Sequence, residues 1–523
     1  MATVVGRVVY ALAALLLVGS FLGLRATTRN VFHYPVTLPG GGPALVYEPG
    51  EPRSWRELPK ADPPLPVVVL AHAFASNPTS MSTLARHLAR AGYAVITPAF
   101  SGHGRNRRPF TYEFGGVASG LIEDLEAAVL YARTQPHLDG QHVALAGHSL
   151  GGHAVLAYAG RDPSVGAVIG ISGGNYLEGP YSPPNLLLIW ASGDPARGRA
   201  HFREVGAQLA GLQRLVLDRT YGDPARGSAV RLSEVEGVGH MSIIYSSETA
   251  RRILAWLEST LGPGIEEAAS PRSDGRFGWS ALGLVAALVL AWGLVRLLAP
   301  LLPRGALPDI RAPITNLAAL LAALLASVLL FAGIDALGTA GPFGIVPLVV
   351  GRDVIGLLAL SGILLWVWLA RRDGITSAAL RDVRTYIGAG LLVGFGYVVI
   401  GTVLQPFLSL WPAPQRVLWC LVCSALCLPY FGATEWLLRG TGATGVWLPV
   451  LGKLLTLGVL FGGAVVGLLP VVILHGVAAI ALGFLLLEVF AYRLSRVAPE
   501  PWVAAVYQAA WLGWALGAVF PLD

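Results

Sequence analysis

The stretch H-V-A-L-A-G-H-S-L-G-G-H-A-V-L-A-Y-A at residues 142–159 decides the fold of the first half of the chain. It opens as a short apolar run, which is typical of a strand buried on both faces of a parallel sheet. A helical segment follows from residue 150, and the junction reads G-H-S-L-G at residues 147–151, a match to G-x-S-x-G. In this motif the serine occupies a sharp, strained turn, and small neighbours let the backbones on both sides approach closely. The pattern therefore predicts an exposed Ser149 hydroxyl at the start of a helix.

Strand-like and helix-like segments alternate on both sides of this motif. The short apolar runs that predict strands lie at residues 66–73, 93–100, 165–172, 186–192 and 230–235. The segments that predict helices lie at residues 79–90, 117–133, 200–212 and 246–259. Alternation at this spacing predicts an α/β fold with a mainly parallel, doubly covered sheet. Such sheets place their chemistry at the carboxyl ends of the strands.

Composition excludes a wholly water-soluble protein. Of the 523 residues, 54% are hydrophobic and 13% are charged, against about 25% charged in a typical soluble protein. The 37 Lys and Arg outnumber the 31 Asp and Glu, but no basic run is interleaved with aromatic residues as a nucleic-acid groove requires. We therefore expect no nucleic-acid partner and relate the basic excess to membrane topology. All three cysteines lie in one apolar segment, so the polar half cannot form an internal disulfide.

Shifts in composition divide the chain into four parts. Residues 1–27 are predicted to be a transmembrane anchor, with a cleaved signal peptide as the alternative. Residues 28–262 hold most of the acidic and histidine residues and form the α/β domain, and residues 263–276 form a polar linker. Residues 277–523 are nearly continuously apolar and predict an all-α, polytopic transmembrane domain.

About eight spans are expected in this last part. They lie near residues 277–298, 313–338, 353–370, 386–409, 417–438, 446–468, 471–492 and 502–520. Arginines concentrate in alternate short loops, which favours a cytoplasmic N-terminus and an outer C-terminus. The expected location is therefore a bacterial-type cell membrane, crossed several times, with the α/β domain on the extracytoplasmic side.

An acid and a histidine follow Ser149 in the order Ser, Asp, His. Asp194 lies in a Gly-Asp-Pro turn directly after the predicted strand 186–192, and Asp218 and Asp223 are rival candidates. His240 lies in a loop after the last predicted strand and before the final helix. The other histidines near these segments, expected to pack or to hydrogen-bond within loops, are His103, His148 and His153.

Five short motifs occur at the ends of predicted strands or shortly after them. They are H-A-F at residues 72–74, S-G-H-G-R at 101–105, G-H-S-L-G-G at 147–152, G-D-P at 193–195 and G-V-G-H at 237–240. In combination they resemble the α/β-hydrolase family over about residues 32–262, with the dienelactone-hydrolase and esterase-like members closest in pattern. The resemblance implies a serine hydrolase that works through an acyl-enzyme.

The resemblance also implies a role for each candidate residue. Ser149 would be the nucleophile, His240 the general base and Asp194 the group that orients the imidazole. The backbone N–H groups of Leu150 and Phe74 would form the oxyanion hole. This chemistry requires no cofactor, and the sequence contains no metal-ligand spacing.

Many relatives carry a helical cap between two of the strands, and this chain has no room for one. Only about thirteen residues, mostly loop formers, separate the predicted strands 165–172 and 186–192. An uncapped site suits extended esters or substrates reached from the surface of a lipid bilayer. The expected partners are therefore the bilayer and an ester substrate, and the sequence leaves the oligomeric state open.

A second, weaker resemblance concerns residues 417–520. Glu435 and Arg439, followed by His475 in a later span, look like the intramembrane CAAX-protease and bacteriocin-processing family, whose first motif is E-E-x-x-x-R. Thr434 replaces the first glutamate of that motif, and Tyr507-Gln508 stands where a second histidine would be expected. We interpret this region as a weakened or inactive relative in which Glu435 and Arg439 neutralise each other, with ion or solute transport as a further option.

The sequence leaves three functions open. The leading one is a membrane-tethered serine hydrolase that cleaves carboxylic esters. A peptidase or acyltransferase of the same fold is the first alternative, because all three reactions share the acyl-enzyme. The second alternative is a membrane binding, transport or assembly protein whose hydrolase-like module is inactive.

Overall fold

The computed structural model describes residues 2–27, 30–50, 63–111, 119–174, 181–262, 274–336, 344–372 and 382–523. The chain divides into two compact units. The sheet unit consists of Phe21–Ser280, Leu404–Ser409 and Pro521–Asp523, and the helical unit consists of Met1–Ser20, Ala281–Val403 and Leu410–Phe520.

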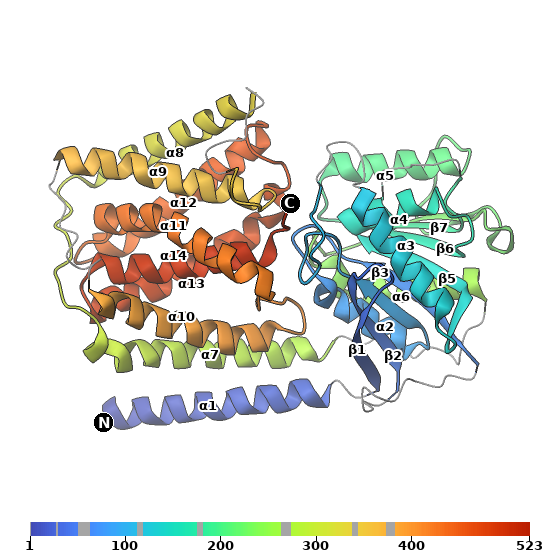
Figure 1. Ribbon diagram of the computed structural model, residues 1–523, viewed down its shortest axis with the longest axis horizontal. Helices are drawn as coiled ribbons and strands as arrows, with labels where there is room; N and C mark the ends of the chain where they lie inside the picture. Colours follow the sequence, from blue (N-terminus) through green and yellow to red (C-terminus); the bar gives the residue numbers. More distant parts are fainter. Residues whose placement is uncertain are drawn as a thin grey trace. The chain divides into compact units, whose positions relative to one another are not determined.

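Within the described residues, the sheet unit contains a nine-stranded sheet (Figure 1). In spatial order the strands are β1 (Val31–Thr37), β2 (Pro43–Pro49), β4 (Ala94–Pro98), β3 (Leu65–Ala71), β5 (Leu138–His148), β6 (Ala167–Ile171), β7 (Leu186–Ala191), β9 (Val230–Val235) and β8 (Thr220–Tyr221). The strands from β4 to β9 are parallel, and antiparallel β1, β2 and β8 complete the two edges. The prediction of a mainly parallel α/β sheet is confirmed.

Helices cover both faces of this sheet. On one face, α2 (Ser82–Arg90) and α6 (Ser247–Leu261) contribute Leu84, Leu88 and Trp256 to a core shared with the strands. The helices α3 (Ser119–Thr134), α4 (Leu150–Ala159) and α5 (Ala196–Leu209) cover the other face (Figure 1). Strands β4, β6 and β7 are buried along their whole length, because helices lie on both sides of them.

Three strands at the edges of the sheet, β1, β2 and the two-residue β8, are absent from the sequence-based prediction. In β1 buried and exposed residues intermix and Pro35 interrupts the run, so the segment lacks the continuous apolar pattern of the central strands. Strand β2 contains Glu48, a buried residue whose carboxylate accepts hydrogen bonds from Tyr34 and His137. The predicted absence of a cap between β6 and β7 falls partly on residues 175–180, and most of the predicted linker falls on residues 263–273; both lie outside the described residues.

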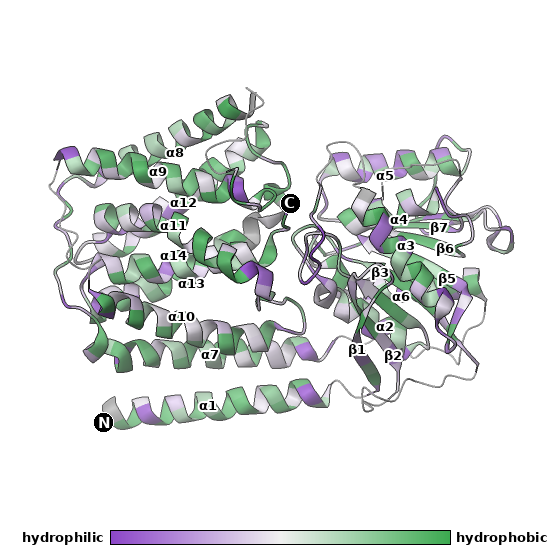
Figure 2. Ribbon diagram, viewed as in Figure 1, coloured by the Kyte–Doolittle hydropathy of each residue, from purple (hydrophilic) through white to green (hydrophobic). Residues whose placement is uncertain are grey.

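The helical unit is built from long apolar helices. They are α1 (Ala2–Ala26), α7 (Arg276–Leu298), α8 (Pro313–Ala336), α9 (Gly351–Arg372), α10 (Val383–Leu404), α11 (Val417–Leu438), α12 (Thr444–Val465), α13 (Ile473–Val497) and α14 (Pro501–Val519). The last residues of α1, the first residues of α7 and the last residue of α10 belong to the sheet unit. In the described part of the chain, eight helices are long and apolar enough to cross a membrane, and α13 is not among them. Figure 2 shows apolar residues along most of their length. These helices are compatible with a multi-pass membrane protein.

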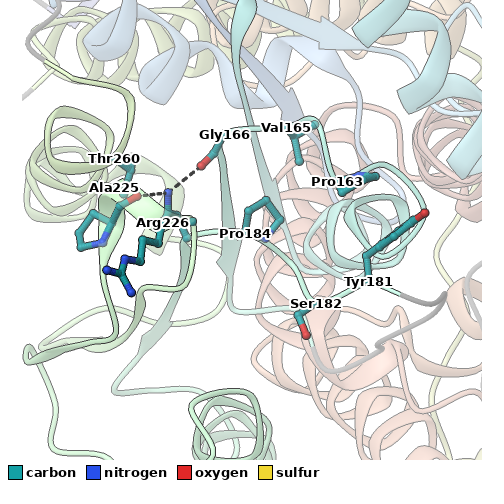
Figure 3. A pocket seen from close by; sticks show the side chains of 12 residues that line it. Pro163, Val165, Gly166, Tyr181, Ser182, Pro184, Ala225, Arg226 and Thr260 are labelled. Carbon is teal, nitrogen blue, oxygen red and sulfur yellow. Dashed lines mark hydrogen bonds between the residues drawn. The ribbon is translucent and has the colours of Figure 1, made fainter.

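A pocket of about 420 Å³ lies at the amino ends of the strands (Figure 3). It is lined by residues that precede β6, β7 and β9, among them Gly166, Pro184 and Arg226. Asn185 also lines the pocket, and its side-chain amide donates hydrogen bonds to the carbonyls of Gly166 and Pro224. This end of the sheet is opposite to the carboxyl ends, where the candidate site lies.

Candidate active site

Ser149 lies at the turn between β5 and α4 with φ +53°, an unusual conformation for a residue other than glycine. The flanking glycines make this turn possible. A Cβ at Gly147 would lie 2.2 Å from the Gly151 carbonyl oxygen, and one at Gly151 would lie 2.6 Å from the Ala71 carbonyl oxygen. Both approaches are too close for any side chain, so steric contact requires glycine at positions 147 and 151. The turn has the form of a nucleophile elbow.

A chain of hydrogen bonds connects the ends of three strands. The Ser149 hydroxyl donates to Nε2 of His240 at 3.0 Å, and Nδ1 of His240 donates to Oδ1 of Asp194 at 2.7 Å. Ser149 follows β5, Asp194 follows β7 and His240 follows β9, so the three residues meet at the carboxyl edge of the sheet. An ionised carboxylate can only accept, so Nδ1 carries the proton and Nε2 can accept one from the hydroxyl.

The rival acids lie elsewhere. Asp218 accepts hydrogen bonds from Ser233 and Arg252. Asp223 caps the short helix η2 (Pro224–Arg226) by accepting from the N–H of Ala225, which is the usual role of an aspartate in an Asp-Pro turn. Of the three candidate acids, the structure brings Asp194 to His240.

Asp194 is buried, with 5% of its surface exposed. Its second oxygen, Oδ2, accepts from the Ser172 hydroxyl at 2.5 Å and from the Ala191 N–H at 3.0 Å. Burial alone would raise the pKa of this carboxyl, but the hydrogen bonds from His240 and Ser172, together with the proximity of His240, hold the pKa below its ordinary value. Asp194 is therefore a carboxylate at neutral pH.

The two expected oxyanion donors lie on separate segments. Leu150 is the first residue of α4, so its N–H has no partner within the helix and lies at the positive end of the helix dipole. His72 lies two residues before Phe74. Its Nε2 accepts a hydrogen bond from the Phe100 N–H at 3.1 Å. Its Nδ1 therefore carries the proton and donates to the Ala73 carbonyl at 2.8 Å. The Ala73 carbonyl and the Phe74 N–H belong to one planar trans peptide and point in opposite directions. Because His72 holds the carbonyl, the Phe74 N–H points away from His72.

His72 stays neutral in this role. Burial lowers the pKa of its imidazole to about 4, and the hydrogen bond to the Ala73 carbonyl opposes this only in part. His103 makes a similar contact on the next turn of the loop: its Nε2 accepts from the Ala75 N–H at 3.3 Å and its Nδ1 donates to the Ser101 carbonyl at 2.9 Å. Ala75 has φ +50°, so His103 holds a strained backbone position.

Residues 66–214 match the family model of the α/β hydrolase fold, and the strand order and the elbow at Ser149 are those of that fold. The sheet unit has the α/β hydrolase fold. A search of curated proteins finds no match for the chain.

Several solved structures resemble the α/β hydrolase unit. A proposed dienelactone hydrolase from Klebsiella pneumoniae is 19% identical and covers 43% of this chain and 98% of its own, with a TM-score of 0.31. The fluorophosphonate-binding serine hydrolase F from Staphylococcus aureus, in a substrate-bound structure, is 14% identical over 43% of this chain and 98% of its own, with a TM-score of 0.31. A hypothetical protein from Pseudomonas aeruginosa is 15% identical over 44% of this chain and 94% of its own, with a TM-score of 0.33. Identities this low say nothing about substrate.

The α/β hydrolase unit contains site residues that the sequence did not reveal. Ser172 and Gly173 directly follow β6, and a Cβ at Gly173 would lie 2.1 Å from the Ser149 carbonyl oxygen. His148, expected to be a packing residue, donates from Nε2 to the backbone carbonyl of His240 at 2.8 Å. The sequence S-G-G at residues 172–174 was the available signal, because it places two glycines at the carboxyl end of a strand next to the nucleophile strand.

Within the described residues, no group of three or more His, Cys, Asp or Glu side chains could hold a metal ion. The groups that meet at the carboxyl edge of the α/β hydrolase unit are a hydroxyl, an imidazole, a carboxylate and backbone amides. These groups can activate a serine by proton transfer and stabilise a developing negative charge.

A second buried polar cluster lies in the helical unit. Arg439 donates to both oxygens of Glu435, at 2.8 Å each, and to both oxygens of Glu488, at 2.6 and 3.0 Å. Lys453 donates to Glu488 at 2.6 Å, and the amide of Gln508 donates to Glu435 at 2.8 Å. The cluster joins α11, α12, α13 and α14 and contains two positive and two negative charges.

The resemblance of residues 417–520 to the intramembrane protease family stays a prediction. Thr434, at the position of the missing glutamate, donates to the carbonyl of Tyr430 within α11. The side chain of His475 lies outside the described part of the structure. Glu435 is engaged on both of its oxygens by Arg439 and Gln508.

Proposed function

We propose that the chain is a membrane-tethered serine hydrolase that cleaves carboxylic esters. The observation that supports it best is the continuous hydrogen-bonded chain from the Ser149 hydroxyl through His240 to a buried Asp194. A decayed relative that served only as a binding module would have no need of this geometry. The strained φ at Ser149 supports the same proposal, because strained backbone is characteristic of functional positions.

In the proposed mechanism Ser149 attacks the ester carbonyl carbon while its proton passes to Nε2 of His240. Asp194 holds the imidazole in the required tautomer and stabilises the imidazolium that forms. The tetrahedral oxyanion accepts hydrogen bonds from the N–H groups of Leu150 and Phe74, and losing one such donor typically costs about 2.7–4 kcal/mol. His240 returns its proton to the departing alcohol, and water then hydrolyses the acyl-enzyme by the same route in reverse.

We further propose that the substrates are extended esters, including lipids reached from the bilayer surface, and that the α/β hydrolase unit lies on the extracytoplasmic side. The long apolar helices of the chain support the membrane part of this proposal. The exposed side chain of Met241, next to His240, offers apolar surface beside the site, which suits an acyl chain better than a charged group.

Covalent labelling of the full-length protein in detergent tests the proposal. A fluorophosphonate should capture the wild type and fail to capture Ser149→Ala, while an exposed serine outside the site, Ser182→Ala, serves as the matched control. A series of esters of increasing chain length, with the corresponding amides, then separates ester hydrolysis from peptidase activity. No capture by folded wild-type protein would refute the enzyme and favour a binding module.

A membrane-impermeant probe tests the orientation. Labelling of intact cells should equal labelling of lysed cells if the site faces outward. Labelling that appears only after lysis would place the site on the cytoplasmic side.

A further inference from the structure

Ser172 occupies the same level of the sheet as Ser149. Strands β5 and β6 pair in parallel with His148 opposite Ile171, so the residues that follow these strands, Ser149 and Ser172, lie side by side. Both have positive φ, +53° at Ser149 and +46° at Ser172. The N–H of Ser172 donates to the Ile189 carbonyl at 2.7 Å, which fixes the backbone between β6 and β7.

The Ser172 side chain points at the acid of the hydrogen-bonded chain. Its hydroxyl donates to Oδ2 of Asp194 at 2.5 Å, while Oδ1 faces Nδ1 of His240 at 2.7 Å. The second donor to Oδ2 is the Ala191 N–H at 3.0 Å. The serine and the aspartate are each 5% exposed, so water has little access to replace the hydroxyl.

The backbone conformation at Ser172 indicates a role for its side chain. Glycine adopts a φ of +46° without steric cost, whereas a residue with a Cβ is strained there. Two glycines follow directly, at positions 173 and 174. A serine at a position that suits glycine therefore indicates a role for the serine side chain. The contact that could explain this role is the hydrogen bond from its hydroxyl to Asp194.

We infer that Ser172 is a positioning residue that holds the Asp194 carboxylate with Oδ1 toward His240. The inference rests on the proposed function. With the hydroxyl in place, both carboxylate oxygens are engaged by fixed donors, so the carboxylate cannot rotate away from the imidazole. Without it, one backbone N–H remains on Oδ2, and the negative charge is shared with fewer donors.

The chain offers a matched control. The Ser233 hydroxyl donates to Oδ1 of Asp218 at 2.5 Å, and Ser233 is 1% exposed. Ser233 lies on β9 and Asp218 precedes β8, so this pair repeats the hydrogen bond from a buried serine to an aspartate at a place away from His240. Ser233→Ala removes a hydrogen bond of the same kind and length without touching Asp194.

The experiment compares Ser172→Ala, Ser172→Gly, Ser233→Ala and wild type, each as the full-length protein in detergent. The rate of fluorophosphonate capture and the kcat/KM for an ester are measured across pH. We expect both Ser172 variants to be about three- to tenfold slower than wild type. Their acid limb should move to lower pH, because a carboxylate that is no longer held toward His240 stabilises the imidazolium less. Ser233→Ala should keep the wild-type profile.

The glycine variant separates positioning from a structural role. Ser172→Gly relieves the φ strain, so its unfolding temperature should exceed that of Ser172→Ala, yet its kinetic loss should be the same. Wild-type rates in Ser172→Gly, or an unshifted acid limb in both variants, would overturn the inference and leave the proposed function intact. Failure of the wild type to be captured at all would overturn both.

Discussion

The substitution Asp194→Asn tests the hydrogen-bonded chain most directly, because it keeps the size of the side chain and removes one acceptor. In the structure Oδ2 receives two donors, Ser172 and the Ala191 N–H, whereas Oδ1 receives one, from His240. The single carbonyl oxygen of an asparagine should therefore turn toward Ser172, and its NH2 group should face Nδ1 of His240. The proton of the imidazole then moves to Nε2, where it blocks transfer from Ser149.

A tautomer trapped in this way costs about 10⁴-fold in kcat, or roughly 5 kcal/mol of transition-state stabilisation. The assay is kcat/KM for a p-nitrophenyl ester, with fluorophosphonate capture as a second measurement, on protein whose folding is checked by circular dichroism. Asp218→Asn and Asp223→Asn are matched controls and should remain close to wild type, because their carboxylates bind Ser233 and Ala225. Near-wild-type activity in Asp194→Asn together with a large loss in either control would refute the assignment.

Three further predictions concern the oxyanion loop, the pH dependence of stability and the helical unit. His72→Phe removes the hydrogen bond that holds the Ala73 carbonyl, and kcat should fall by about 10- to 100-fold with little change in KM, measured by steady-state kinetics; an unchanged kcat would show that the loop holds its conformation without the imidazole. The pKa of Asp194 is lower in the folded protein than its unfolded value of 3.8, so the carboxylate stabilises the folded state fully above pH 3.8 and loses this effect as pH falls through the folded pKa. In that acidic range the unfolding temperature of wild type should drop more steeply than that of Asp194→Asn. Parallel curves of unfolding temperature against pH would contradict this. Glu488→Gln removes the carboxylate that Lys453 contacts and should destabilise the detergent-solubilised protein by about 3–5 kcal/mol. The double variant Glu488→Gln, Lys453→Met should recover part of this stability. A double variant no more stable than the single one would refute the pairing.

The central strands could be predicted because burial on both faces makes their sequences continuously apolar. Strands β4, β6 and β7 are buried throughout, and the sequence alone located them to within a few residues. Strand β1 could not be found in the same way. Its exposed positions intermix with buried ones, and its pairing with β2 depends on a partner that the local pattern does not identify.

The residues of the candidate site also differ in how well the sequence alone reveals them. Ser149 has a local signature, since the glycines around it are required by steric contact within the turn. Asp194 and His240 could be located by the order of elements. Ser172 could not, because its contact with Asp194 depends on the parallel register of β5, β6 and β7, which brings residues 22 positions apart together. The tautomer of His72 likewise follows from a contact with the Phe100 N–H that no short motif encodes.

The two buried polar clusters differ in what they leave available for chemistry. His240 presents an unprotonated Nε2 to a hydroxyl, and its side chain is 15% exposed, so a substrate can approach the pair. Glu435 is 1% exposed, and both of its oxygens accept from the Arg439 guanidinium in a bidentate contact. To activate a water molecule, Glu435 would have to break charge-assisted hydrogen bonds and leave a positive charge exposed to an apolar interior. We therefore assign the proposed ester hydrolysis to Ser149, and the charges among α11, α12, α13 and α14 are better suited to holding these helices together.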